Sequence, residues 1–232
     1  GVFKGAGDGS AILRMHSKGK LVICDTVKMK RGKFVFEGET PCVGFALVTV
    51  VPEGKESVQM RLALENSKIE MKGDWKNVGM DEEEELVVKG MTVTGSKNND
   101  VNEEIGKQWK VVETLPGFTK YAELAKKVQD NPEILEDTTF YWVYRKEFDA
   151  YMARVKEEQL KIIVANPSVE TAAYQLYFMM NEMPLEQLEQ IFGLFDEKVG
   201  ESELASEVRA CIELRQRIEP GRPAPEFTLA RR

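Results

Sequence analysis

The first 95 residues consist of short apolar runs separated by turn residues. In residues 21–29 the apolar side chains fall mainly at positions 21, 23, 27 and 29, which is the period of two expected of a half-buried strand. On this pattern we expect strands near residues 1–4, 11–15, 21–29, 33–36, 43–51, 57–64, 68–72 and 86–94. Several short strands separated by glycine, proline and asparagine predict an antiparallel β-sandwich or barrel.

Beyond Gly95-Ser96 the apolar positions recur every three or four residues, which is the period of a helix. Such stripes run through residues 105–112, 118–128 and 148–162. Three further helices are expected over residues 169–181 with Asn166-Pro167-Ser168 as N-cap, from Pro184 to Phe195, and from near Ser202 to Ile218. The second part of the chain is therefore predicted to hold about six helices.

The two patterns together predict an α+β fold, with an N-terminal antiparallel β-sandwich or barrel followed by an all-α helical segment. We place a β domain at residues 1–97 and a helical domain at residues 98–219. Residues 220–232 combine prolines with the strand-forming Phe227-Thr228-Leu229, which is typical of a linker that enters a further domain.

Composition and charge narrow the classes of function. The chain of 232 residues is 42% hydrophobic and 31% charged, which is ordinary for a globular protein. A net charge of −7 disfavours nucleic acid as a partner, because such binding depends on lysine and arginine neutralising phosphates. The longest apolar run, residues 43–51, is too short for a membrane-spanning helix. The chain begins without a methionine, so we expect that its natural N-terminus was processed.

No catalytic, cofactor-binding or metal-binding residue is assigned from the sequence. His16 is the only imidazole available as a base, and its place at a strand end favours an exposed turn residue. The glycine-rich stretch 5–10 leads into an expected strand rather than a helix, so a β-hairpin turn is favoured over a phosphate loop. The acidic run 81–85 lacks the ligand spacing of a calcium loop and is expected to be a solvated loop between strands.

The cysteines and the aromatic clusters leave alternatives open. Cys24, Cys42 and Cys211 form no CxxC pair. Cys24 and Cys211 are expected to be small buried hydrophobic residues, and Cys42 to be the least buried of the three, with a redox role for Cys42 disfavoured. The aromatic residues within 140–144 and 174–178 are expected to be core or helix-packing surface, with a ligand groove as the alternative.

Several motifs resemble one family over nearly the whole chain. Residues 25–38, DTVKMKRGKFVFEG, resemble the "DSv...G.F.F.G" signature of the N-terminal β domain, of unknown function, carried by many bacterial envelope thiol-disulfide oxidoreductases. Residues 64–71, LENSKIEM, resemble its "LENGkI.V" strand, with Ser67 where glycine is usual. Residues 94–99, TGSKNN, resemble the "tGS..N" that closes that domain, and the helix opening at residue 166 is also similar.

The tail resembles the start of another domain. Residues 220–229, PGRPAPEFTL, are similar to the "G..APdFtL" entry of thioredoxin-like domains of the alkyl hydroperoxide reductase and thiol-specific antioxidant type, although residues 230–232, ARR, depart from the Asp-Gly expected next. The resemblance implies an intact protein that is an envelope-anchored, periplasm-facing, thioredoxin-like thiol-disulfide oxidoreductase. Its CxxC would follow residue 232, because a thioredoxin fold needs on the order of a hundred further residues.

On this resemblance we expect the chain to be the non-catalytic N-terminal region of such an oxidoreductase. It would position the redox domain, bind protein thiol or disulfide clients, or mediate homodimerisation. Its partners would be the C-terminal thioredoxin-like domain of the same protein and those clients, with no cofactor and no nucleic acid. The alternative is a β-sandwich module that binds a glycan or a peptide.

Overall fold

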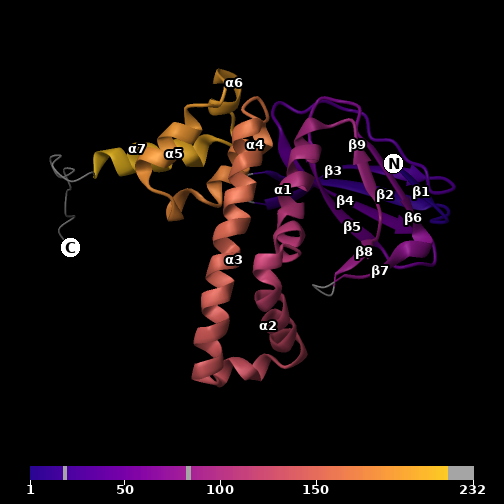
Figure 1. The fold of residues 1–232 in the computed structure, drawn as a ribbon. Coiled ribbons are helices and arrows are strands. Elements are labelled where there is room, and N and C mark those ends of the chain that lie inside the picture. The colour runs from indigo at the N-terminus through magenta and orange to yellow at the C-terminus, as the bar shows by residue number, and fades with distance from the viewer. Residues whose placement is uncertain (18–19, 82–84, 219–232) are drawn as a thin grey trace, which may run out of the picture. The chain divides into compact units, whose positions relative to one another are not determined.

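The chain folds into two compact units, shown in the computed structural model of Figure 1. The structure describes residues 1–17, 20–81 and 85–218, and the side chains of these residues except 16, 17 and 20–22. The β unit comprises Gly1–Asp100 with Ser202–Leu204, and the helical unit comprises Val101–Glu201 and the residues from Ala205 onward. Each unit is described by itself.

The β unit is built from nine strands among the described residues, in three sheets. The strands are β1 (Val2–Lys4), β2 (Gly9–Ser17), β3 (Lys20–Met29), β4 (Gly44–Pro52), β5 (Val58–Leu64), β6 (Glu70–Asp74), β7 (Val78–Met80), β8 (Leu86–Val88) and β9 (Thr92–Thr94). The largest sheet has the antiparallel order β3-β2-β4-β5, the second has the order β1-β6-β9, and β7 pairs with β8. These antiparallel-rich sheets confirm the predicted fold class, and they do not close into a barrel.

The core of the β unit follows from alternation along its strands. In β4 every second residue from Ala46 to Pro52 is buried, and β5 buries Val58, Met60 and Leu62 in the same way. These side chains pack with those of the second sheet and of the loops, and the cluster includes Phe3, Phe34, Met71 and Trp75. Removal of this apolar surface from water, at roughly 25 cal/mol per Å², is what holds the unit together.

Three predictions of strands and turns in this unit were wrong. Residues 86–94 form two strands instead of one, since β8 pairs with β7 and β9 pairs with β6. Residues 33–36 form no strand: Lys33 makes isolated bridges to Val2 and Lys30. Phe34 is nevertheless buried, because its ring stacks on Phe3 at a centroid distance of 6.0 Å. The glycine-rich stretch 5–10 is not a hairpin turn, since β1 pairs in parallel with β6 whereas β2 pairs with β3 and β4.

Seven α-helices are present among the described residues. They are α1 (Lys97–Glu113), α2 (Thr119–Asp130), α3 (Thr138–Ala165), α4 (Glu170–Tyr177), α5 (Leu185–Phe192), α6 (Glu197–Gly200) and α7 (Ser206–Arg217). The first of them, α1, begins in the last residues of the β unit and continues into the helical unit. Short 3-10 turns stand at Trp75–Asn77, Pro116–Phe118, Pro132–Glu136 and Met180–Glu182. No helix in the described part of the chain is long and apolar enough to cross a membrane.

Three predicted helix ends differ from the structure. Asn166 ends α3 instead of capping the next helix: its Nδ2 donates to the carbonyl of Ile162 at 2.8 Å. The helix expected over 169–181 ends at Tyr177. The last helix begins at Ser206 rather than near Ser202. The expected linker at residues 220–232 lies outside the described residues.

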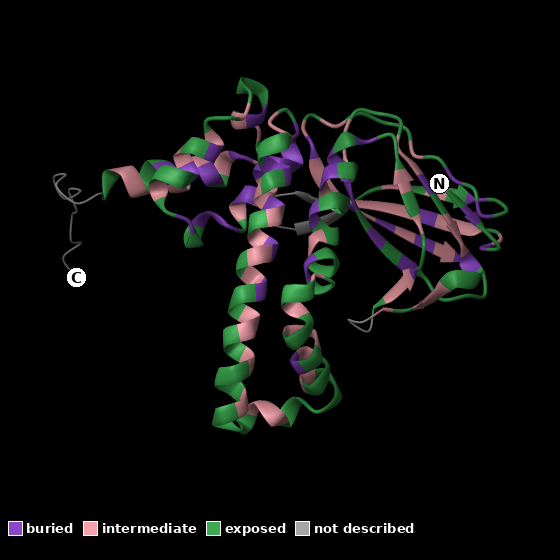
Figure 2. Cartoon of the chain, viewed as in Figure 1, coloured by how far each residue is buried: buried purple, intermediate pink, exposed green. Residues whose placement is uncertain are grey.

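Burial divides the long helix α3 into two halves. With 28 residues it is about 42 Å long at 1.5 Å per residue. Its C-terminal half buries side chains from Tyr151 to Ile163, whereas its N-terminal half, which runs beside α2, is largely exposed or half-buried (Figure 2). The α2–α3 pair is therefore an arm of the helical unit with much accessible surface.

Candidate functional site

Residues 25–38, the first of the three motifs of the β unit, contain a tight turn. Arg31 and Gly32 both have positive φ, and the backbone N–H of Arg31 donates to Asp8 Oδ1 at 2.7 Å. The N–H of Gly32 donates to the carbonyl of Gly7 at 2.6 Å. A Cβ at Gly32 would lie 1.9 Å from the carbonyl oxygen of Phe3, so only glycine fits there. The stretch 5–10 therefore stabilises this turn through hydrogen bonds.

The third signature clamps β5 to the start of α1. The N–H of Ala63 donates to Asn99 Oδ1 at 2.8 Å, and Asn99 Nδ2 donates to the carbonyl of Ala63 at 2.7 Å. Ser96 Oγ accepts from the backbone N–H of Asn99 at 3.1 Å and from its Nδ2 at 2.8 Å. All three residues are buried. Ala63 pairs with Phe45 of β4 on one side, and on the outer edge of β5, where the sheet has no further strand, Asn99 satisfies its backbone groups.

The second signature makes a similar clamp at the surface. The N–H of Thr40 donates to Asn66 Oδ1 at 2.8 Å, and Asn66 Nδ2 donates to the carbonyl of Thr40 at 2.7 Å. Ser67, in the position where the family has glycine, donates its hydroxyl to the carbonyl of Gly95 at 3.0 Å. The signature residues therefore serve the architecture of the β unit, and none of these contacts assembles a nucleophile with a base.

The three cysteines differ in burial. Cys24 is exposed, which contradicts the expected burial. The cause is a bulge in β3: Leu13 pairs with Asp25 and Arg14 with Ile23, so Cys24 has no opposite residue and the alternation is broken. The same bulge leaves Ile23 62% exposed.

Cys42 and Cys211 are both half-buried, so Cys42 is not the most accessible thiol. Cys42 Sγ donates to Glu203 Oε2 at 3.2 Å. Reactive thiolates have cationic neighbours, whereas the neighbour of this thiol is a carboxylate. Cys211 packs against the core of the helical unit, as expected from its stripe.

The other sequence candidates do not combine into a site. The backbone of His16 pairs with Leu21 in the β2–β3 ladder, and its side chain lies outside the described residues. The acidic run connects β7 to β8, where the N–H of Glu85 donates to Asp81 Oδ1 at 2.9 Å, and residues 82–84 are not described. Within the described ranges, no group of three or more His, Cys, Asp or Glu side chains is placed to hold a metal ion.

The aromatic residues of the arm divide between packing and exposure. Tyr121 stacks on Tyr151 at a centroid distance of 4.0 Å, and Tyr151 donates its hydroxyl to the carbonyl of Trp109 at 2.8 Å. Burial is the main cause that raises the pKa of each tyrosine to about 12. Tyr141 and Trp142 lie on the exposed part of α3, and the Trp142 side chain is 64% exposed. Within the predicted cluster 140–144, Tyr144 stacks on Tyr121 at a centroid distance of 6.3 Å, as expected of helix packing, whereas Tyr141 and Trp142 offer a contact surface.

A second exposed aromatic group stands at the end of α4. Tyr174, Tyr177 and Phe178 form edge-to-face and stacked pairs with centroid distances of 5.1 to 6.4 Å. Phe178 is 59% exposed. None of these three residues lines either hollow described below, so the structure does not place them in a ligand groove.

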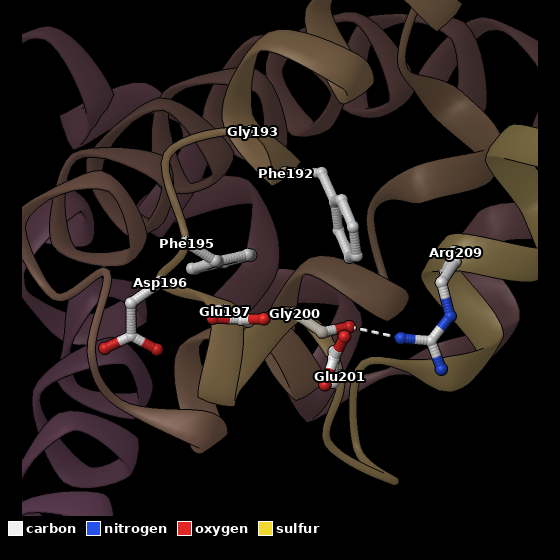
Figure 3. A pocket seen from close by; sticks show the side chains of 8 residues that line it. All are labelled: Phe192, Gly193, Phe195, Asp196, Glu197, Gly200, Glu201 and Arg209. Atoms are coloured by element: carbon white, nitrogen blue, oxygen red, sulfur yellow. Dashed lines mark hydrogen bonds between the residues drawn. The ribbon is translucent and has the colours of Figure 1, made fainter.

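Two hollows stand out on the described surface, one in each unit. The helical unit has a hollow of about 600 Å³ lined by Phe192, Gly193, Phe195, Asp196, Glu197, Gly200, Glu201 and Arg209 (Figure 3). We call it the Phe192–Phe195 hollow. Its phenylalanines fall within the helix predicted from Pro184 to Phe195, and the carboxylates beside them were not predicted. The density of acidic residues after Leu185 is the feature of the sequence that marks these carboxylates.

The hollow of the β unit is polar. It measures about 650 Å³ and is lined by Gly38, Glu39, Glu65, Asn66, Ser67 and Lys68. Glu65 Oε2 accepts from Asn98 Nδ2 at 2.8 Å, whereas its buried Oε1 has no hydrogen-bond partner among the described residues. A buried carboxylate oxygen without a donor is costly, so Glu65 is the one side chain here that a hydroxyl or ammonium group would satisfy.

Comparison with known proteins bears on the β unit. No curated protein and no solved structure matches the chain. The model of a family described as a domain of unknown function, DUF4369, matches residues 1–102. That range holds all nine strands and both clamps, so the β unit is similar to this domain from its first strand to the beginning of α1.

Proposed function

We propose that this chain is the non-catalytic region that precedes a thioredoxin-like domain in a periplasmic thiol-disulfide oxidoreductase, and that its helical unit binds client proteins. The observation that carries the proposal is the exposed aromatic surface of the arm, Tyr141 and Trp142 on α3. Tryptophan and tyrosine are enriched where proteins bind one another, because they bury large areas and lose little conformational entropy.

Two further observations support a scaffold role for the β unit and client binding by the arm. The signature residues of the β unit are engaged in clamps and turns, which fits a scaffold. Residues 220–229 resemble the entry to a thioredoxin-like domain, which would supply the CxxC. The β unit in this proposal positions the redox domain, while the arm recognises the client.

The test begins with the reading frame downstream of residue 232 and continues with the full-length protein. If a CxxC follows, we expect Trp142→Ala to raise KM for reduction of a protein disulfide such as that of insulin, and to leave reduction of a small aromatic disulfide unchanged. Lys146→Ala, also exposed on α3, is the matched control and should change neither.

Three results would refute the proposal. The first is a reading frame that stops at residue 232. The second is insulin reduction by residues 1–232 alone at the rate of a thioredoxin. The third is an equal loss of protein and small-molecule reduction in Trp142→Ala. Homodimerisation stays a prediction, which sedimentation equilibrium of the chain would test.

A second candidate function is binding of a hydroxyl-rich ligand such as a glycan by the β unit. The specific observation in its favour is Glu65 Oε1, buried without a donor beside the polar hollow. A trisaccharide of N-acetylglucosamine that raises the melting temperature of the chain, but not that of Glu65→Gln, would support it. Equal shifts in both proteins would remove it.

A further inference from the structure

The Phe192–Phe195 hollow combines an aromatic wall with an acidic rim. Phe192 is the last residue of α5 and Phe195 follows in the loop to α6, and their rings meet edge to face at 6.0 Å. Figure 3 shows the Phe192 ring pointing into the hollow with the Phe195 ring beside it. Both side chains are half-buried, so part of each ring remains available to a ligand.

Three carboxylates stand along the same hollow, from Asp196, Glu197 and Glu201. Asp196 Oδ1 accepts from the N–H of Val199 at 2.9 Å and so caps α6. The single cation of the lining, Arg209, donates to the carbonyl of Gly200. The lining therefore has a net negative charge, and its guanidinium is held by a backbone oxygen.

The sequence around the hollow adds further negative charge. Residues 185–213 contain eight aspartate and glutamate residues against one lysine and one arginine, a net of −6, in a chain whose total is −7. The stretch that contains the hollow is thus strongly acidic, although the run 81–85 elsewhere in the chain also carries five carboxylates. Such a concentration attracts cations and repels anions before contact is made.

We propose that the Phe192–Phe195 hollow binds an arginine or lysine side chain presented by a basic segment of a partner protein. The aliphatic stem of such a side chain packs on the phenylalanine rings, and its charge lies over a ring face and near the carboxylates. A volume of about 600 Å³ admits several residues of a peptide, within the 300–1,000 Å³ of ordinary ligand sites. An anion is repelled by the rim, and a purely apolar ligand gains no attraction from the carboxylates.

This inference goes beyond the proposed function and does not depend on it, because binding is measured on residues 1–232 without any redox assay. The probe is a fluorescein-labelled peptide of alternating glycine and arginine, followed by fluorescence anisotropy at low ionic strength. The same peptide with citrulline in place of arginine has nearly the same shape and no charge. We expect the arginine peptide to bind and the citrulline peptide to bind at least about tenfold more weakly.

Charge variants separate the hollow from the general field of the protein. The double variant Glu197→Gln/Glu201→Gln is expected to weaken binding of the arginine peptide by about tenfold. Glu207→Gln/Glu213→Gln removes the same charge from exposed positions outside the lining and should weaken it less than about twofold. Phe195→Leu keeps most of the packing volume and removes the aromatic ring, and it is expected to weaken binding of the arginine peptide by about threefold.

The outcomes are distinct. Equal losses in the two double variants, or equal binding of the arginine and citrulline peptides, overturn the proposal. Binding that appears only after removal of residues 219–232, which contain three arginines, also overturns it, because the occupant is then this chain's own tail. Since the exchanged carboxylates are exposed, the double variants test the proposal even if Phe195→Leu fails to fold.

Discussion

Two asparagines make the same pair of hydrogen bonds in different surroundings, and this allows the cost of burial to be measured. Asn99 accepts from the N–H of Ala63 and donates to its carbonyl, at 2.8 and 2.7 Å. Asn66 does the same for Thr40, again at 2.8 and 2.7 Å. Ala63 is fully buried, whereas the Asn66 clamp is exposed. We therefore compare Asn99→Ala with Asn66→Ala.

Loss of the buried Asn99 clamp should lower the free energy of unfolding far more than loss of the exposed Asn66 clamp. Asn99→Ala leaves two buried backbone groups of Ala63 without partners, at about 1–3 kcal/mol each. The better helix propensity of alanine returns only about 0.6 kcal/mol. We expect the free energy of unfolding of the β unit to fall by about 3 kcal/mol. Water can replace the partners of Thr40, so Asn66→Ala should cost about 1 kcal/mol or less.

Site-resolved unfolding in urea provides the assay. Fluorotryptophan labelling gives fluorine NMR signals for Trp75 in the β unit and for Trp109 and Trp142 in the helical unit. The urea midpoint of the Trp75 signal yields the stability of the β unit in each variant. If Asn66→Ala destabilises the β unit as much as Asn99→Ala does, burial is not what gives the clamp its energy, and the reasoning fails.

Three further predictions test single features of the two units. Gly32→Ala places a Cβ 1.9 Å from the carbonyl oxygen of Phe3, and circular dichroism should show that the β unit of this variant is unfolded. Gly54 also has positive φ but faces open space, so Gly54→Ala should lower the free energy of unfolding by only about 1–2 kcal/mol. The pKa of Tyr151, raised to about 12 by burial, exceeds the value of about 10 in the unfolded chain. Its contribution to stability, about 2–3 kcal/mol, is therefore complete below pH 10 and lost as the pH rises through 12; thermal melts of Tyr151→Phe should show a shallower loss over that range. Cys24 should react with a thiol reagent at neutral pH before Cys42, as read by mass spectrometry, and fast reaction of Cys42 would contradict the effect of its carboxylate partner.

How far the sequence predicts this fold depends on whether the relevant contact is local. Alternation in residues 44–52 identifies β4 because each side chain's face follows from its own position in the strand. The parallel pairing of Val2–Lys4 with Lys72–Asp74 joins segments about seventy residues apart, and no local period encodes it. The exposure of Cys24 has the same origin, since a bulge is a property of the β2–β3 register rather than of β3 alone.

The candidate sites show the same limit at the level of chemistry. The spacing of a motif predicts that its residues act together, and Ser96 and Asn99 do so, as partners in a hydrogen-bonded clamp. The sequence does not say whether such a group binds a ligand or holds a strand, because the backbone atoms of Ala63 that it satisfies lie thirty-six residues away. The Phe192–Phe195 hollow required a three-dimensional view for the opposite reason: its phenylalanines fit a core stripe, and only the turn into α6 brings three carboxylates beside them.

The division between the two units explains why a match to the β unit carries little information about activity. The motifs at residues 25–38, 64–71 and 94–99 lie within the matched range and supply clamps and a turn, so a protein that shares them shares a scaffold. Two described features that offer chemistry to a partner, the exposed aromatics of the arm and the acidic hollow, lie outside the matched range, whereas the polar hollow beside Glu65 lies within it. On the proposed function, two chains with the same β unit can differ in their clients, and the arm and the Phe192–Phe195 hollow would encode such a difference. Exchange of residues 101–218 between two proteins with similar β units should transfer client preference, whereas exchange of residues 1–100 should not.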